Sequence, residues 1–208
     1  MESKPSTTTG THLPVMEAFY TLQGEGKFAG HAAYFIRLGG CDVGCVWCDV
    51  KESWNASLWP VLSIEKIVSD ALVFPARLVV ITGGEPLIYP MSPLTTLLKE
   101  KGFSIHLETS GAHPFSGNFD WVCFSPKKFK KPDPSIYSVA DELKVVVYHS
   151  SDLVFAQEHA TRVGSGCELR LQPEWSKAAD RLPELIDFIK SNPSWKISLQ
   201  THKFMDIP

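Results

Sequence analysis

The chain has 208 residues, of which 44% are hydrophobic and 21% charged, and its 20 basic and 23 acidic residues give a formal net charge of −3. This balance suits one globular domain with a sizeable core, and it lacks the basic excess with which nucleic-acid-binding domains contact phosphates. No stretch is apolar for long enough to span a membrane, and no N-terminal segment has the pattern of a signal peptide. We therefore expect a cytoplasmic protein that acts on a small molecule, with neither nucleic acid nor membrane as a partner.

Residues 1–11 are polar and rich in serine and threonine, which predicts a disordered or loosely attached tail. Residues 12–208 contain neither a repeat nor a linker-like segment and are expected to form a single domain. Three of the five cysteines lie within eight residues of one another, a spacing that argues against a disulfide framework. We expect these cysteines to be reduced.

The first predicted strand covers residues 33–38, and Gly39 and Gly40 end it. Ser63 is suited to cap a helix, because apolar residues recur after it with helical spacing. A strand of the buried type follows at 78–81, and residues 94–101 form a short helix that Gly102 ends. A further helix is predicted around residues 182–189, and further strands at 105–108, 121–124, 143–147, 169–172 and 197–200.

Strands that alternate with helices indicate parallel βαβ units. A complete eight-unit barrel usually needs about 250 residues, so this chain is expected to form a reduced, partly open parallel β/α barrel. Polar or glycine-rich signatures follow five of its predicted strands, namely GGCDVGCVWC, TGGEP, ETSG, SPKK and QPE. Ligands bind at the carboxyl ends of strands in such folds, and the pattern therefore predicts one large site at that rim.

The loop after the first strand has the sequence Cys41-x-x-x-Cys45-x-x-Cys48. Three thiolates leave one iron of a four-iron cluster open to another ligand, since a cubane cluster normally has four cysteine ligands. A structural zinc site wants four protein ligands, and no fourth cysteine or histidine lies nearby in the sequence. Zinc binding and inert cysteines stay as minor alternatives. Cys123 and Cys167, in or beside apolar strands, are expected to be core residues.

The spacing C-x-x-x-C-x-aromatic-C resembles the signature of the radical S-adenosylmethionine superfamily. The resemblance implies a 4Fe–4S cluster on Cys41, Cys45 and Cys48, with S-adenosylmethionine on its open iron. It also implies that Trp47 lies against the adenine, although an indole in this loop also suits simple packing. Residues 82–86, TGGEP, resemble the motif that holds the methionine amino group in that superfamily.

A narrower resemblance, to the 7-carboxy-7-deazaguanine synthase family, extends over residues 19–208. It rests on the start FYTLQGEG at 19–26, Arg37 before the first cysteine, SPK at 125–127, QP at 172–173 and QTHK at 200–203. The resemblance implies conversion of 6-carboxy-5,6,7,8-tetrahydropterin to 7-carboxy-7-deazaguanine with release of ammonia, on the way to 7-deazapurines such as queuosine. It implies a 5′-deoxyadenosyl radical that takes a hydrogen from the pterin and later returns it.

The resemblance also implies which residues form the site. Those expected to bind the substrate are Leu22, Gln23, Gly24, Glu25, Arg37, Thr82 and Pro208. Those expected to contact S-adenosylmethionine are Trp47, Cys48, Asp49, Gly84, Glu85, Glu108, Ser125, Pro126, Lys127 and Gln172. The residues alone leave three other roles open: a simple turn at 23–26, a surface salt bridge for Arg37 and a capping role for Glu108. The C-terminal segment is expected to be part of the site, with Phe204, Met205 and Ile207 buried, although a segment that only caps the barrel remains an alternative.

One residue departs from the family pattern. The family has a threonine after Cys-Asp that ligates a magnesium ion, but here the sequence is Cys48-Asp49-Val50. Magnesium is still implied as a cofactor, yet its protein ligand is unknown and the dependence on it is in doubt, because valine cannot ligate and only Asp49 or water is available to compensate.

The resemblance further implies a homodimer and a reducing partner such as flavodoxin or ferredoxin. Two other functions stay open at this point. A glycyl-radical activating enzyme shares the cysteine spacing but acts on a protein, and the LQGEG and QTHK segments count against it. A non-enzymatic iron–sulfur electron carrier would need no GGEP motif and would normally have a fourth cysteine.

Overall fold

The computed structural model describes residues 9–208. The tail predicted for residues 1–11 therefore lies mostly outside the described residues, and its boundary stays a prediction. In the part that is described, Gly10 is buried against Pro90, and the carbonyl of Thr11 accepts a hydrogen bond from the amide of Ile64.

The fold is a curved nine-stranded sheet in the order β3-β1-β2-β4-β5-β6-β7-β8-β9. From β2 to β9 every neighbouring pair is parallel, whereas β1 pairs antiparallel with both β2 and β3. Because β3 and β9 are the two ends of this order, the barrel is open there. The strands are β1 (His12–Leu22), β2 (Ala32–Leu38), β3 (Val61–Ser63), β4 (Leu78–Gly83), β5 (Ser104–Thr109), β6 (Trp121–Phe124), β7 (Glu142–Val147), β8 (Glu168–Pro173) and β9 (Trp195–Ile197).

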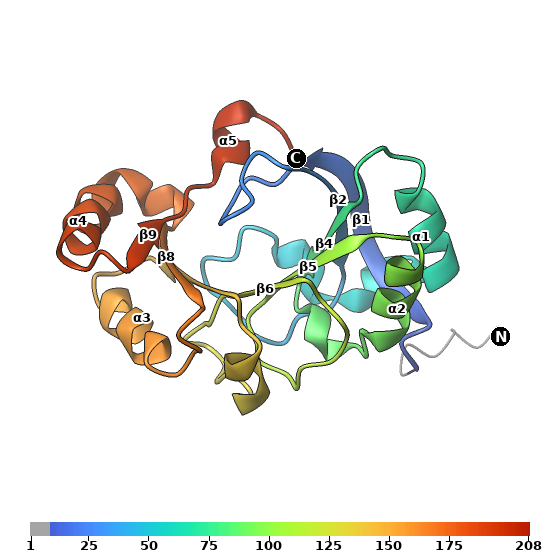
Figure 1. Ribbon diagram of the computed structural model, residues 1–208, viewed down its shortest axis with the longest axis horizontal. Coiled ribbons are helices and arrows are strands. Elements are labelled where there is room, and N and C mark those ends of the chain that lie inside the picture. The colour runs from blue at the N-terminus through green and yellow to red at the C-terminus, as the bar shows by residue number, and fades with distance from the viewer. Residues whose placement is uncertain (1–8) are drawn as a thin grey trace.

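Helices cover the outside of the curved sheet (Figure 1). Helix α5 instead lies near the loop that follows β1, where the amide of Thr201 donates to the carbonyl of Gly24 at 2.9 Å. Within residues 9–208 no helix has the length and apolar character needed to cross a membrane. The helices are α1 (Ile64–Ala71), α2 (Ser92–Glu100), α3 (Asp152–Ala160), α4 (Ala178–Ser191) and α5 (Thr201–Met205).

The structure confirms the partly open barrel and most of the predicted elements. The six strands predicted before the last agree with β2 and β4–β8 to within two residues at each end, and Ser63 caps α1 by accepting from the amide of Lys66. The strand predicted at 197–200 is wrong, since β9 is Trp195–Ile197. Pairing with β8 ends where Leu171 meets Ile197, and the hydroxyl of Ser198 then donates to Gln172 in the interior.

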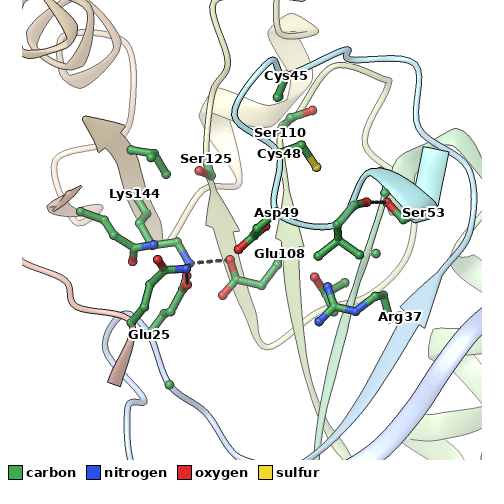
Figure 2. Close-up of a pocket in the computed structure, with 18 of the residues that line it drawn as sticks. Glu25, Arg37, Cys45, Cys48, Asp49, Ser53, Glu108, Ser110, Ser125 and Lys144 are labelled. Carbon is green, nitrogen blue, oxygen red and sulfur yellow. Dashed lines mark hydrogen bonds and ion pairs between the residues drawn. The ribbon is translucent and has the colours of Figure 1, made fainter. Parts of the chain in front are cut away.

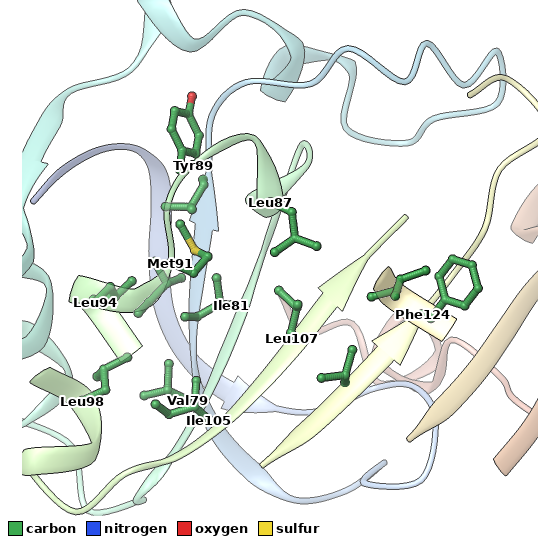
Figure 3. Close-up of a cluster of buried hydrophobic side chains, with 14 of the residues drawn as sticks. Val79, Ile81, Leu87, Tyr89, Met91, Leu94, Leu98, Ile105, Leu107 and Phe124 are labelled. Atoms are coloured by element: carbon green, nitrogen blue, oxygen red, sulfur yellow. The ribbon is translucent and has the colours of Figure 1, made fainter. Parts of the chain in front are cut away.

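The hydrophobic core lies between the sheet and its covering helices (Figure 3). Side chains alternate along a strand, so Val79 and Ile81 of β4 and Leu107 of β5 point outward and meet Leu94 and Leu98 of α2, all fully buried. The intervening residues face the inside of the barrel. There the side chains are largely polar, and they prepare the site described below.

We expect Leu107→Ala to lower the free energy of unfolding by about 2–5 kcal/mol, because it opens a cavity in a packed core. Leu72, which is 38% exposed just after α1, provides the matched control. Leu72→Ala should cost about 0.5 kcal/mol or less. Urea unfolding of the two variants measures the difference, and equal costs would show that the core is not where the structure places it.

Candidate active site

A cavity of about 300 Å³ opens at the carboxyl ends of the strands. All five polar signatures that follow the predicted strands contribute to its lining, as the sequence predicts. The expected site residues that line it are Leu22, Gln23, Gly24, Glu25, Arg37, Cys41, Cys45, Trp47, Cys48, Asp49, Val50, Thr82, Gly84, Glu108, Ser125, Lys127, Gln172 and Pro208. Two expected site residues, Glu85 and Pro126, do not line this cavity.

Two glycines seat the TGGEP turn directly against the start of the cysteine loop. The amide of Gly84 donates to the carbonyl of Leu38, and the amide of Glu85 donates to the carbonyl of Gly40, both at 2.9 Å. Gly83 has a φ of 147°, which only glycine adopts readily. A Cβ on Gly84 would lie 2.2 Å from the Gly40 carbonyl oxygen and 2.7 Å from the Cβ of Cys41. The close approach of the two motifs therefore requires glycine at position 84.

Glu85 supports this turn from inside the protein. Its side chain is 1% exposed and accepts hydrogen bonds from the amides of Leu87 and Ser110 and from the hydroxyls of Thr109 and Ser110. Two chain segments at the ends of β4 and β5 are thereby joined. Glu85 is buried behind Thr109 and Ser110, which line the cavity while Glu85 does not, and its expected contact with a cofactor stays a prediction.

The three cysteines lie on one loop at the cavity wall and fit a cluster better than a single ion. Within residues 9–208 no three His, Cys, Asp or Glu side chains converge as ligands of one metal ion. In a cubane cluster each cysteine binds a different iron, so the sulfurs need not meet at one point. Burial raises the pKa of the Cys45 thiol to about 11, although the positive charge of Lys127 acts in the opposite direction. Iron binding would have to displace this proton.

A buried ammonium lies at the wall of the cavity, between two carboxylates (Figure 2). Lys144 of β7 is only 3% exposed, and its Nζ lies 2.6 Å from Oε2 of Glu25 and 2.9 Å from Oε2 of Glu108. Gln200 donates to the second oxygen of Glu25 at 2.9 Å. The arrangement joins the loop after β1, strand β5, strand β7 and the segment before α5. Glu108 is thus an ion-pair partner, and the capping role that the sequence left open is not observed.

The ammonium sets the charge of both carboxylates. Burial would raise the pKa of Glu25, but the charge and hydrogen bond of Lys144, with the hydrogen bond from Gln200, lower it to about 2. Burial raises the pKa of Glu108, an effect that Lys144 opposes and the Glu25 charge reinforces. Burial would lower the pKa of Lys144, yet Cys123 and the surrounding carboxylates raise it well above its ordinary value. Glu25 is therefore a fixed anionic acceptor at neutral pH.

Arg37 and an aromatic pair form the wall beside β1 and β2. The Nε of Arg37 donates to Glu17 at 2.6 Å, and the residue also lines the cavity. Arg37 therefore forms the salt bridge that the sequence left open and also lies in the site. Phe19 and Phe35 are register partners, and their rings stack with centroids 5.4 Å apart and an interplanar angle of 4°. A flat ring and a carboxylate are the ligand features that such a wall suits.

The C-terminal segment folds over the cavity but does not bury its apolar side chains. Gly24 lies so close to His202 that a Cβ there would be 2.2 Å from its Nδ1, and Pro208 lines the cavity. The expected burial of Phe204 and Met205 is wrong, because they are 69% and 44% exposed. The reason is geometric: α5 has only five residues, and Phe204 meets only the edge of the half-exposed Trp175, at 5.2 Å between ring centroids.

A second, smaller cavity of about 230 Å³ adjoins the first and shares Trp47, Lys127 and Val146 with it. Pro126 lines this second cavity, together with the aromatic residues Phe129, Tyr148 and Phe155. Trp47 meets Phe129 edge to face at 6.2 Å between ring centroids, and the Nζ of Lys127 lies 5.4 Å from the Trp47 centroid. The two cavities together offer a polar chamber beside an aromatic one.

Sequence reasoning missed Lys144 and the cavity position of Phe35. Phe19, His202 and Lys203 lie in segments that it assigned to the site, without a role for their side chains. A usable signal for Lys144 exists, because it is the one charged residue within the apolar run LKVVV at 143–147. A lysine on a strand buried on both faces must have a partner.

Comparisons with known proteins agree with this geometry. The Radical SAM superfamily profile matches residues 35–130. The chain is 52% identical over 199 residues to the 7-carboxy-7-deazaguanine synthase of Flavobacterium psychrophilum, covering 96% of this chain and 94% of that protein. Identity to the 7-carboxy-7-deazaguanine synthase of Synechocystis is 44% over 194 residues, covering 93% of each chain. The crystal structure of QueE from Escherichia coli superposes with a TM-score of 0.84 at 34% identity, covering 94% of this chain and 97% of that one.

We expect Gly84→Ala to disrupt the cysteine loop, because the added methyl group would overlap the Gly40 carbonyl and the Cys41 side chain. Anaerobically purified variant protein should contain markedly less iron and show weaker visible absorbance than the natural protein. Gly164→Ala is the matched control, since a Cβ there meets nothing within 4 Å. Full iron content in Gly84→Ala would contradict the tight contact between the two motifs.

Proposed function

The chain belongs to the 7-carboxy-7-deazaguanine synthase family of radical S-adenosylmethionine enzymes, and we propose that it converts 6-carboxy-5,6,7,8-tetrahydropterin to 7-carboxy-7-deazaguanine with release of ammonia. The observation that carries the proposal is one cavity that combines a three-cysteine loop with an anionic acceptor, Glu25, and a guanidinium, Arg37. The product is a precursor of 7-deazapurines such as queuosine.

We propose a position for each cofactor from the residues that fit it. A 4Fe–4S cluster would bind Cys41, Cys45 and Cys48, and S-adenosylmethionine would lie between the TGGEP turn and the aromatic second cavity, with its adenine against Trp47. When bound, the cluster supplies the electron that cleaves S-adenosylmethionine and so begins the radical reaction. Glu108 on β5, together with Ser125 and Lys127 after β6, completes the polar surface available to the ribose and methionine groups.

The pterin would occupy the part of the cavity between β1, β2 and the C-terminal segment. Its donor-rich, guanidine-like edge matches the Glu25 carboxylate, which retains lone pairs beyond those used by Lys144 and Gln200. Its carboxylate matches the Arg37 guanidinium, of which only Nε is engaged by Glu17 among the described residues. Gln23 is buried, and its side-chain oxygen accepts a hydrogen bond from the amide of Glu25. Its side-chain NH2 group is left as a donor for the pterin.

The Lys144 ammonium joins these two halves of the site. It holds Glu25 in its anionic form on the substrate side and Glu108 on the cofactor side, through contacts of 2.6 and 2.9 Å. Since Lys144 is buried on a strand that is paired on both sides, it holds both carboxylates in the structure without any ligand. Fixed acceptors of this kind keep the reacting atoms in one geometry and lower the cost of orienting them.

A reducing electron donor is required by the reaction, and a flavodoxin or ferredoxin remains our proposal for it. The homodimer and the cytoplasmic location, expected from the sequence, also stay predictions.

The reaction itself is the first test. Anaerobic protein supplied with S-adenosylmethionine, dithionite and the carboxylated tetrahydropterin should form 7-carboxy-7-deazaguanine and ammonia, detected by mass spectrometry and an ammonia assay. The variant with Cys41, Cys45 and Cys48 all changed to alanine should be colourless and inactive. Cleavage of S-adenosylmethionine without any conversion of the pterin would rule out the proposed substrate. It would favour a glycyl-radical activating enzyme instead.

Lys144→Met should weaken equilibrium binding of the pterin by about ten- to a hundredfold, the usual effect of removing a partner from a buried charge. The natural protein should show no titration of Glu25 near neutral pH, because its pKa is about 2. In the variant, burial without the ammonium raises the pKa of Glu25, so affinity should fall further as the pH is lowered and this acceptor becomes protonated.

Lys144→Arg is the conservative control and should retain much of the affinity, since it keeps the charge. Lys190→Met, at an exposed position on α4, should bind the pterin as the natural protein does. Calorimetry across a pH series measures all four proteins. An affinity of Lys144→Met that matches the natural protein at every pH would rule out this role.

A further inference from the structure

We propose that the ammonium of Lys203 occupies the place of a magnesium ion in this site and, with Arg37, binds the substrate carboxylate. The inference rests on the proposed function, which supplies that carboxylate. It departs from the magnesium cofactor expected from the sequence, and it gives a role to Lys203 that the sequence did not reveal.

Position 50 offers no ligand for a divalent cation. The side chain of Val50 is apolar, and its carbonyl oxygen already accepts hydrogen bonds from the hydroxyl of Ser53 at 2.7 Å and from the amide of Ser53 at 3.1 Å. No group of three His, Cys, Asp or Glu side chains within residues 9–208 is arranged for a metal ion. In proteins magnesium keeps several of its waters and takes only one or two carboxylate oxygens from the chain, so the state of the neighbouring Asp49 decides whether this wall can hold the ion.

Asp49 is the remaining carboxylate beside position 50, and it already has a cation. The Nζ of Lys203 lies 3.1 Å from Oδ2 of Asp49. A magnesium ion on Asp49 would have to displace this ammonium or lie beside it against like-charge repulsion. The cation position next to Val50 is therefore filled by the protein itself.

The Lys203 ammonium is held over the cavity by its own helix. Helix α5 is anchored to the loop after β1, since both the amide and the hydroxyl of Thr201 donate to the carbonyl of Gly24 at 2.9 Å. The Nζ of Lys203 also lies 5.2 Å from the centroid of the Trp175 ring, within reach of a cation–π contact. Its side chain is 22% exposed, so it is steadied by protein on several sides.

Lys203 and Arg37 line the same cavity as Val50. An ammonium has three donors, and the contact with Asp49 uses one of them. The guanidinium of Arg37 likewise uses only its Nε, toward Glu17, among the described residues. Two cations with unused donors thus line the cavity that Val50 also lines, and a carboxylate bound by both would be held without a metal.

The test is equilibrium binding of 6-carboxy-5,6,7,8-tetrahydropterin to the cluster-loaded protein, measured by calorimetry in excess magnesium and in excess chelator. We expect the natural protein to bind equally well in both. Lys203→Met should bind about ten- to a hundredfold more weakly in chelator, whereas Lys203→Arg should retain most of the affinity. Lys190→Met, exposed on α4, is the matched control and should bind normally.

The double variant Lys203→Met with Val50→Thr tests whether the loss of binding comes from the missing positive charge or from a disturbed structure. If the ammonium stands in for a metal, adding a hydroxyl ligand should restore binding only in the presence of magnesium. A natural protein whose affinity falls tenfold in chelator would overturn the inference, and so would a Lys203→Met variant that keeps its iron and binds normally. Failure of the pterin to bind the natural protein in either buffer would instead remove the proposed function, and this inference with it.

Discussion

The ion pairs of one buried lysine organise the site. Lys144 is almost completely removed from water, and a lone ammonium in that position would lose its proton or destabilise the fold. It stays charged because Glu25 and Glu108 reach it from two other parts of the chain. The position of the loop after β1, and with it the substrate side of the cavity, depends on this pairing. Removing the ammonium would leave two buried carboxylates in mutual repulsion.

The same constraint explains why the inside of this barrel is polar. Barrel interiors are usually filled by branched apolar residues, but here ionic contacts continue below Lys144 toward the other end of the strands. Glu142 of β7 lies 3.2 Å from the Nε of Arg170 of β8, whose Nη2 is 2.7 Å from Glu168. Lys27 in turn lies 2.9 Å from Glu168. Each of these four charges has an opposite neighbour, so the polar interior is compatible with a stable fold.

Local patterns predicted strands β2 and β4–β8 and the rim of the site, because apolar runs that end in glycine or polar motifs are visible in sequence. Strands β1 and β3 were not predicted, and the bounds of β9 were wrong. The interior pairing was not predictable, since Glu25 and Lys144 are 119 residues apart and only the fold brings them together. Helix α3 was missed for a related reason. Two of its three buried residues, Asp152 and His159, are polar, so no apolar face marks it. The exposure of Phe204 depends on the short reach of α5, which composition does not reveal.

The opening between β3 and β9 also has a physical account. In the described chain no strand pairing joins β3 to β9. Side-chain and backbone contacts join the C-terminal segment to the loops after β1 and β2 instead. Thr201 bonds to Gly24, Gln200 to Glu25 and Lys203 to Asp49. Such contacts break at less cost than a strand ladder, because each is a single and partly solvated interaction. The C-terminal segment is therefore held to the rim of the barrel by individual contacts, and we expect it to separate from the rim more readily than the paired strands separate from one another.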